Sequence, residues 1–316
     1  MKPTIVGGHD AEKDRFKYIV SLTTNSGRHV CGGSLIASDI VLTAAHCEGY
    51  FSKVVVGLYH NTDDHLQETE SFNVTGTIVH PFYDQKFLRY DFLVVKLDNH
   101  SSYPIVSLDV DHKLTTTSIL VLGWGITDSD NRTPYVGPLQ VAFLKYIPND
   151  ICSDSDGFMD GSYASYEGLI TESMLCAVSP GTHACSGDSG GPLILKGNND
   201  KEDVQIGIVS WGFECGNDSF PGVYSRVRNQ FSWIQEIVCI LSDDVPSQYT
   251  CKRRDNLRRP IANDCNNSRH CQKDGFDCVS GKCLGPRMRH NYDSTREFSS
   301  SYKNIFHRIK HSKSDD

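Results

Sequence analysis

Short apolar runs, each followed by residues typical of turns, dominate the chain from residue 5 to residue 240. Runs of this length, bounded by glycine, proline, asparagine and aspartate, are typical of β-strands. No repeated alternation of strand and helix patterns accompanies them. The pattern therefore predicts a body of many short strands. Clear examples are 40–42, 53–57, 118–122 and 205–210.

One segment near the end of this body has a different period. Its apolar positions recur at roughly helical spacing, which predicts a closing helix whose apolar stripe packs on the strands. The stripe needs no other explanation than core packing. Its members are Phe231, Trp233, Ile234, Ile237 and Val238.

The pattern changes again after residue 240. Residues 241–283 are polar and rich in cysteine, and the segment is too small to build an apolar core, so crosslinks would have to hold it together. We expect a compact extension there, with either a binding role or a purely structural one. Residues 284–316 are dominated by arginine, histidine, serine, lysine and aspartate, and we expect them to be disordered.

The length and the charge of the chain limit the kinds of function it can have. The 316 residues suffice for a substantial core plus an appendage, and no stretch approaches the roughly 20 apolar residues that a membrane span needs. The net charge of −8 is uneven: residues 1–240 carry −13 and residues 241–316 carry +5. The acidic body argues against nucleic-acid binding, and we expect the basic tail to be solvated rather than bound to an acidic surface.

Cysteine usage indicates an oxidising compartment. Twelve cysteines without zinc-like spacing favour disulfides, and the chain also carries five acceptor motifs for N-glycosylation, so a secreted glycoprotein is expected. The first four residues are too short and too polar for a signal peptide, and we expect upstream sequence to be missing and residues 1–4 to be a remnant of a propeptide. The glycosylation motifs begin at Asn73, Asn99, Asn131, Asn217 and Asn266.

The clearest chemical motif is the hexapeptide at residues 187–192, Gly-Asp-Ser-Gly-Gly-Pro. Its glycines permit a tight turn that exposes the hydroxyl of Ser189. Such a turn also aims the backbone N–H groups of Gly187 and Ser189 at one point, as in an oxyanion hole. Because serine alone is a poor nucleophile, this motif needs a base and an acid that orients the base.

Both partners are present upstream. His46 follows the apolar run 40–42, and Asp91 begins the run 92–97. The order histidine, aspartate, serine is that of the chymotrypsin arrangement, and it differs from the orders in subtilisin and in the α/β-hydrolases. This region resembles the trypsin/chymotrypsin family of serine endopeptidases.

The resemblance runs from Ile5 to about Ile240 and rests on several separated motifs in the family's order. It implies an all-β fold of two antiparallel six-stranded β-barrels with a C-terminal helix. The domain organisation is then a protease domain at 5–240, a cysteine-rich extension at 241–283 and a disordered basic tail at 284–316. Besides the three residues above, the matching motifs are Ile5-Val6-Gly7-Gly8, Cys31-Gly32-Gly33-Ser34-Leu35-Ile36, Gly123-Trp124-Gly125, Val209-Ser210-Trp211-Gly212 and Pro221-Gly222-Val223-Tyr224.

The family pattern also implies three disulfides in the body. The first would hold the segment of His46, and the third would brace the substrate pocket. These pairs are Cys31–Cys47, Cys152–Cys176 and Cys185–Cys215. A clasp between Cys239 and Cys251 plus two bridges in the extension is consistent with the rest, but four cysteines allow three connectivities. The four are Cys265, Cys271, Cys278 and Cys283.

The resemblance implies acyl transfer without a cofactor or metal. His46 would take the proton of Ser189 as the serine attacks a peptide carbonyl, and Asp91 would orient the histidine. The segment Ser210-Trp211-Gly212 matches the strand that pairs with an extended substrate. The expected partners are protein or peptide substrates and protease inhibitors, and the oligomeric state stays open.

Activation is a second requirement of the family. Cleavage before Ile5 would free an amine that pairs with Asp188, and this pair would order the oxyanion hole. The residue before Ile5 is Thr4, where the family usually has arginine or lysine. Self-activation by a trypsin-like cut is therefore not expected, and the chain as written has the character of a precursor.

The substrate pocket departs most from the family. Six residues before Ser189, where trypsins carry aspartate, this chain has His183, while Gly212 and Gly222 leave the pocket walls open. A neutral His183 favours aromatic or large apolar side chains, and a charged one favours acidic side chains. A third reading has Glu214 pair with His183 or support some preference for basic side chains.

A calcium site is an open question. The segment 59–70 carries four carboxylates in roughly the region where some relatives bind calcium, but the spacing does not match and a solvated acidic loop is the favoured interpretation. These residues are Asp63, Asp64, Glu68 and Glu70.

Two rival functions remain at this stage. A catalytically silent homologue could act as a binding or regulatory protein, although the complete set of His46, Asp91 and Ser189 argues against it. Alternatively, the cysteine-rich extension could be the functional end, with the protease fold as its carrier.

Overall fold

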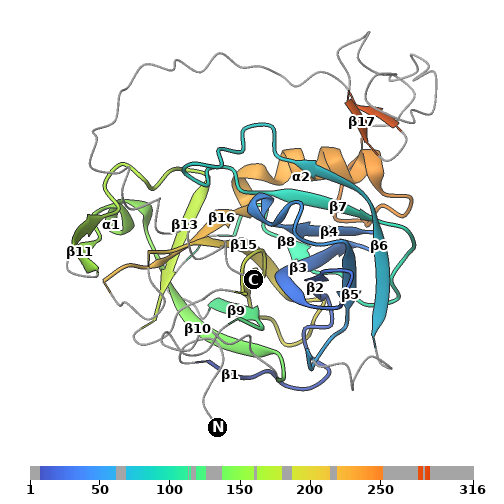
Figure 1. Ribbon diagram of the computed structural model, residues 1–316, viewed down its shortest axis with the longest axis horizontal. Helices are drawn as coiled ribbons and strands as arrows, with labels where there is room; N and C mark the ends of the chain where they lie inside the picture. The colour runs from blue at the N-terminus through green and yellow to red at the C-terminus, as the bar shows by residue number, and fades with distance from the viewer. Residues whose placement is uncertain are drawn as a thin grey trace.

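The computed structural model describes residues 8–61, 69–112, 114, 119–125, 137–159, 162–179, 187–213 and 219–251, together with the backbone of two short strands at 277–279 and 282–284. Two β-barrels lie side by side, and a helix closes the body on one side (Figure 1). The expected fold class is confirmed.

The first barrel is closed by six antiparallel strands in the order β2-β3-β4-β7-β6-β5. Two of its strands, β2 and β4, are buried along their whole length, which explains why their sequences are largely continuous apolar runs rather than alternating ones. The strands are β2 (Ile19–Thr23), β3 (His29–Ala37), β4 (Ile40–Thr43), β5 (Lys53–Val56), β6 (Glu70–Val79) and β7 (Leu93–Leu97).

The second barrel is closed because β9 pairs with both β10 and β14. Its six strands are β9 (Ile119–Gly123), β10 (Gln140–Ile147), β13 (Met174–Val178), β14 (Pro192–Leu195), β15 (Val204–Trp211) and β16 (Gly222–Arg226). Two short strands extend its sheet: β1 (His9–Asp10) pairs with β10, and β8 (Ser107–Leu108) pairs in parallel with β15.

The remaining elements lie outside the barrels. They are the 3-10 turn η1 (Ala45–Cys47), helix α1 (Asn149–Ser153), the hairpin of β11 (Asp156–Met159) and β12 (Ser162–Ser165), helix α2 (Val227–Leu241) and the strand pair β17 (Asp277–Val279) and β18 (Lys282–Leu284). Helix α2 is the expected closing helix, and Ile234, Ile237 and Val238 of its predicted stripe are buried. Within the described residues, no helix has the length and apolar character to cross a membrane.

Ten residues that follow α2 pack against the first barrel, and we call residues 242–251 the C-terminal clasp. Asp39, buried in the barrel, accepts hydrogen bonds from Ser242 Oγ at 2.6 Å and from the backbone N–H of Asp243 at 2.9 Å. Lys96 forms ion pairs with Asp39 and Asp243. The start of the predicted extension is therefore part of the body's surface.

The far end of the C-terminal clasp is equally anchored. The side chain of Gln248 accepts a hydrogen bond from the backbone N–H of Leu108 at 3.1 Å, and Tyr249 is only 5% exposed. A disulfide joins Cys239 of α2 to Cys251. The other four cysteines of the extension have no described side chains, so their connectivity lies outside the described residues.

The two barrels are also tied together away from the site. Both guanidinium nitrogens of Arg15 contact Asp203 in the loop before β15, at 2.6 and 2.7 Å, and Arg15 pairs with Asp200 as well. Tyr18 donates to Asp203 at 2.7 Å. Burial, followed by the charge of Asp203, raises the pKa of Tyr18, so the phenol stays a donor. These contacts join segments more than 180 residues apart in the chain.

Candidate active site

His46 lies in the 3-10 turn η1, directly after β4. A disulfide between Cys31 of β3 and Cys47 fixes this turn to the first barrel, as the family pattern implied. The side chain of His46 is 12% exposed, so one edge of the ring reaches the surface. The turn thus presents a held imidazole at the barrel's rim.

Asp91 is completely buried just before β7 and orients this imidazole. Its Oδ1 accepts the backbone N–H of His46 at 2.8 Å, and its Oδ2 accepts the Nδ1–H of the ring at 2.7 Å. Ser210 of β15 donates its hydroxyl to Oδ2 at 2.6 Å. Because Nδ1 of His46 donates to this carboxylate, Nε2 is left as the nitrogen that can accept a proton.

Ser189 lies in a turn of the second barrel that presses against the first. Its carbonyl accepts the backbone N–H of Gly32 in β3 at 2.7 Å. The next residue, Gly190, has φ +79°, and a Cβ there would lie 2.1 Å from Oγ1 of Thr43, close to His46 in sequence. Only glycine fits this close approach. The turn of Ser189 and the segment of His46 are therefore brought together across the interface between the barrels.

The proposed oxyanion-hole residue Gly187 also has left-handed backbone, with φ +98°. Its carbonyl accepts the Nε2–H of His29 at 2.9 Å, while Nδ1 of His29 accepts the hydroxyl of Ser21 at 2.7 Å. Burial lowers the pKa of His29, so the ring is neutral in this arrangement. This role could not be predicted from the sequence, because nothing in the local pattern distinguishes His29.

Asp188 is fully buried beside Ser189. Its Oδ1 accepts the backbone N–H of Gly125 at 2.8 Å, and a Cβ at Gly123 or Gly125 would collide with its carboxylate. These two glycines therefore make room for the acid. Ile5, its expected partner, lies outside the described residues.

The expected substrate strand runs away from Asp91. Ser210 contacts Asp91 at one end, and Trp211 is half-buried next to it. Gly212 has no heavy atom within 4 Å of an ideal Cβ position, which leaves this edge open, and a Cβ at Gly222 would lie 3.2 Å from the ring of Tyr224. His183, Glu214 and the pair Cys185–Cys215 lie outside the described residues.

Four aromatic residues at the end of this strand pack on one another, and we call them the aromatic cluster: Tyr166, Trp211, Phe213 and Phe220. Ring centroids lie 5.1 Å apart for Tyr166 and Trp211, 4.7 Å for Tyr166 and Phe213, and 5.1 Å for Phe213 and Phe220. Such edge and tilted contacts are favourable between rings. The disulfide Cys152–Cys176 lies in the same apolar cluster of side chains.

Metal ligands do not assemble among the described residues near the site. Cys31, His46 and Cys47 lie close together, but both cysteines are in a disulfide. In the acidic segment considered for calcium, Glu70 accepts the hydroxyl of Ser101 at 2.6 Å and that of Ser102 at 2.5 Å. The other three carboxylates of that segment lie outside the described residues.

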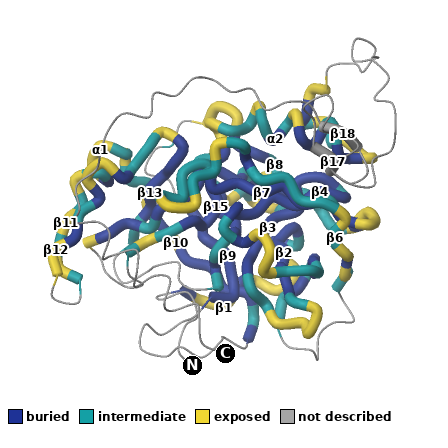
Figure 2. The backbone as a smooth tube through the Cα atoms, turned by 45° about the horizontal axis from the view of Figure 1, so that its top comes forward, coloured by how far each residue is buried: buried dark blue, intermediate teal, exposed yellow. Residues whose placement is uncertain are grey.

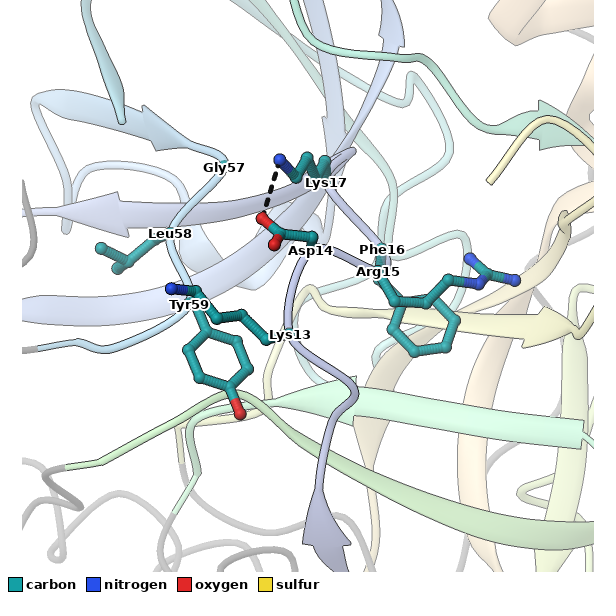
Figure 3. Close-up of a pocket in the computed structure, with 8 residues that line it drawn as sticks. All are labelled: Lys13, Asp14, Arg15, Phe16, Lys17, Gly57, Leu58 and Tyr59. Carbon is teal, nitrogen blue, oxygen red and sulfur yellow. Dashed lines mark ion pairs between the residues drawn. The ribbon is translucent and has the colours of Figure 1, made fainter. Parts of the chain in front are cut away.

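A separate hollow lies on the first barrel, lined by Lys13, Asp14, Arg15, Phe16, Lys17, Gly57, Leu58 and Tyr59 (Figure 3). An ion pair of 2.9 Å joins Lys17 and Asp14 there, and the guanidinium of Arg15 is engaged by Asp203. None of the residues expected in catalysis lines it. The hollow is therefore separate from the candidate active site.

Comparisons with known proteins agree with the geometry. The sequence pattern of the family described as Trypsin matches residues 5–234. Curated relatives include "Trypsin" of Sus scrofa, which is 37% identical over 241 residues that cover 74% of this chain and 95% of the relative. "Serine protease 1" of Homo sapiens is 36% identical with 74% and 89% covered, and "Cationic trypsin-3" of Rattus norvegicus is 38% identical with the same coverage.

Proposed function

The chain belongs to the trypsin family of serine proteases, and on this premise we propose that it is a secreted serine endopeptidase whose catalytic residues are His46, Asp91 and Ser189. The observation that carries the proposal is the pair of hydrogen bonds that His46 donates to Asp91, one from its backbone N–H and one from Nδ1–H. It fixes both the position and the tautomer of the imidazole that a serine nucleophile needs. The turn of Ser189, held against the same segment, supports it.

The proposed reaction proceeds through an acyl-enzyme. The hydroxyl of Ser189 attacks the peptide carbonyl and gives its proton to Nε2 of His46, while the buried carboxylate of Asp91 stabilises the imidazolium. The N–H groups of Gly187 and Ser189 stabilise the oxyanion. His46 then protonates the leaving amine, and water releases the acyl group by the reverse sequence.

Substrate binding is proposed along Ser210-Trp211-Gly212. The acyl side of an extended peptide would add to this open edge through backbone hydrogen bonds. His183 at the pocket base makes aromatic or large apolar side chains the first choice for the residue before the scissile bond, ahead of basic and then acidic ones. Protease inhibitors would occupy the same strand.

Activation is proposed to couple Ile5 to Asp188. Asp188 is buried next to the serine turn and already accepts Gly125 N–H. A free amine at Ile5 would add a cationic partner, and a buried ion pair is favourable only when both partners are in place. Cleavage before Ile5 would therefore order the turn that holds Gly187 and Ser189.

Secretion is supported by the chemistry of the chain. Three disulfides are present among the described residues, and such bonds persist in oxidising compartments. The glycosylation motifs at Asn73 and Asn99 have exposed asparagines.

The test uses a form of the protein whose first residue is Ile5, with the matched variant Ser189→Ala. Both are treated with a covalent serine-hydrolase probe and with a peptide library varied on the acyl side of the scissile bond. We expect labelling and cleavage that depend on Ser189. The residue preferred before the scissile bond then shows which kind of side chain the pocket with His183 accepts.

Two outcomes would change the assignment. If the folded protein, with its disulfides formed, neither reacts with the probe nor cleaves any peptide, the silent binding homologue replaces the enzyme. If acidic residues are preferred before the cut, the preference should fade between pH 5 and pH 8 when a charged His183 is its cause. A preference that stays flat or rises with pH excludes that cause.

A further inference from the structure

The β11–β12 hairpin stands apart from both barrels at one edge of the molecule (Figures 1 and 2). Phe158 of β11 and Tyr163 of β12 face each other across the two strands, with ring centroids 5.9 Å apart. Phe158 is 74% exposed and Tyr163 is 60% exposed. The fold does not need these two rings in its core, since both are exposed. Paired exposed aromatic rings are typical of binding surfaces.

The base of this hairpin is fixed to the aromatic cluster. A Cβ at Gly157 would lie 3.3 Å from the side chain of Ser219 and 3.6 Å from the ring of Phe220. Tyr166, which follows β12 directly, is buried and donates its hydroxyl to the carbonyl of Pro221 at 2.9 Å. The exposed pair is thus held on a rigid base rather than on a loose loop.

The aromatic cluster also shows at which end of the substrate strand the hairpin lies. Ser210 touches Asp91 at one end of the substrate strand. At the other end, Phe213 packs between Tyr166 and Phe220. A peptide that pairs with this strand from the scissile bond outward therefore runs toward the hairpin with its acyl-side residues.

The segment that carries the hairpin has charges of one sign, and Arg226 of β16 donates to the side chain of Asn149 at its start. Residues 149–173 contain six carboxylates and no lysine, arginine or histidine. Five of the carboxylates are exposed and have no ion-pair partner within the described residues: Asp150, Asp154, Asp156, Glu167 and Glu172. A field of this kind attracts cations and repels acidic segments.

We propose that the β11–β12 hairpin is an exosite for the acyl-side extension of protein substrates. Its ligand is an extended segment in which lysine or arginine alternates with aromatic or aliphatic residues. The apolar side chains pack on Phe158 and Tyr163, and the cations lie near the five carboxylates and the ring faces. This inference rests on the proposed endopeptidase function and adds a substrate class to it.

The test compares two peptides that share the best cleaved sequence from the library. One carries the acyl-side extension Lys-Phe-Lys-Leu, and the other carries Glu-Phe-Glu-Leu, with the unextended peptide as reference. For the full chain with Ile5 first, kcat/KM should be about tenfold higher for the lysine peptide than for the glutamate peptide. The difference should shrink as salt is raised.

Three variants separate the parts of the exosite. Phe158→Ser with Tyr163→Ser should bring the two extended peptides to within about twofold, and Asp154→Asn with Glu167→Gln should lower the lysine preference severalfold and weaken its salt dependence. Phe143→Ser removes an exposed ring of β10 and should leave the preference intact. The unextended peptide should be cleaved equally by all four proteins.

A binding measurement makes the exosite testable without turnover. Fluorescein-labelled Lys-Phe-Lys-Leu and Glu-Phe-Glu-Leu peptides are titrated with the Ser189→Ala protein and followed by fluorescence anisotropy. Tighter binding of the lysine peptide, lost in the Phe158→Ser, Tyr163→Ser background, supports the exosite even if no peptide is cleaved. Equal affinity for both peptides, or a preference unchanged by the hairpin variants, overturns it. Failure of cleavage alone counts against the proposed catalytic function.

Discussion

Asp91 holds His46 by two hydrogen bonds, one to the backbone N–H at 2.8 Å and one to Nδ1–H at 2.7 Å. The backbone bond sets where η1 lies relative to β7, and the ring bond sets which nitrogen carries the proton. A single carboxylate therefore controls both the placement and the tautomer of the proposed base.

Replacing the carboxylate of Asp91 by an amide should remove its control over the tautomer of His46. Asp91→Asn replaces one of two accepting oxygens by an NH₂ donor that faces hydrogen-bond donors, and we expect kcat on a short peptide to fall by roughly three to four orders of magnitude. Turnover per probe-labelled site at pH 8 measures the loss. Asp111→Asn, an exposed aspartate, is the control and should leave kcat unchanged. A loss of less than tenfold would mean that Asp91 does not orient the base.

Gly190 offers a test of how tightly the serine turn is pressed against the first barrel. Gly190→Ala puts a methyl group 2.1 Å from Thr43 Oγ1 and 2.6 Å from the carbonyl of Gly32. We expect the variant to lose nearly all probe labelling and at least about 3 kcal/mol of unfolding free energy. Gly49→Ala is the matched control, because Gly49 has φ +82° with no atom within 4 Å. It should cost only about 1–2 kcal/mol.

Arg15 tests the connection between the barrels. Arg15→Ala would leave the buried carboxylate of Asp203 without its guanidinium, and the unfolding free energy should fall by about 3–5 kcal/mol. Lys17→Ala breaks an ion pair with Asp14 in which both side chains are well exposed, and it should cost less than about 1 kcal/mol. Urea unfolding in the Ser189→Ala background avoids self-digestion. Equal costs for the two variants would contradict the buried role of Arg15.

His80 makes the stability depend on pH. Burial lowers its pKa to about 4, against the opposing hydrogen bond to Gln230. Between about pH 6.5 and pH 4, His80 is therefore protonated in the unfolded chain but neutral in the folded chain. The unfolding free energy should drop by up to about 3 kcal/mol as the pH falls through this range. His29, whose pKa burial also lowers, contributes with the same sign. Above pH 6.5 neither histidine should matter.

Urea unfolding of the Ser189→Ala protein at pH 7.5, 5.5 and 4.5 measures this dependence. His80→Gln should remove much of the decrease, because a neutral side chain binds no proton in either state. His100→Gln, at an exposed position, should retain the decrease of the parent protein. A slope that is the same with and without His80 would exclude the histidine as its source.

Much of the fold was predictable because each strand and helix is encoded by the hydrophobic pattern of its own short segment. Each apolar run at 40–42, 53–57 and 205–210 became a strand, and the stripe from Phe231 to Val238 became part of α2. The candidate site was predictable for a related reason. His46, Asp91 and Ser189 each lie in a short motif, and the order of the motifs carries the resemblance.

Other features depend on where distant segments meet, and a single sequence does not contain that information. Arg15 and Asp203 are 188 residues apart and neither lies in a recognisable pattern. The support of Gly187 by His29 depends on β3 passing behind the serine turn. The β11–β12 hairpin has too few apolar residues to stand out, since its exposed rings serve no core.

The two barrels share one set of proposed catalytic groups: His46 and Asp91 come from the first barrel, and Ser189 comes from the second. The catalytic rate therefore depends on how accurately the two barrels are aligned at their interface. A displacement of about 1 Å of one barrel relative to the other can lower the rate about a hundredfold while the strands stay folded. On gentle heating, activity should therefore vanish before the circular dichroism of the strands begins to change.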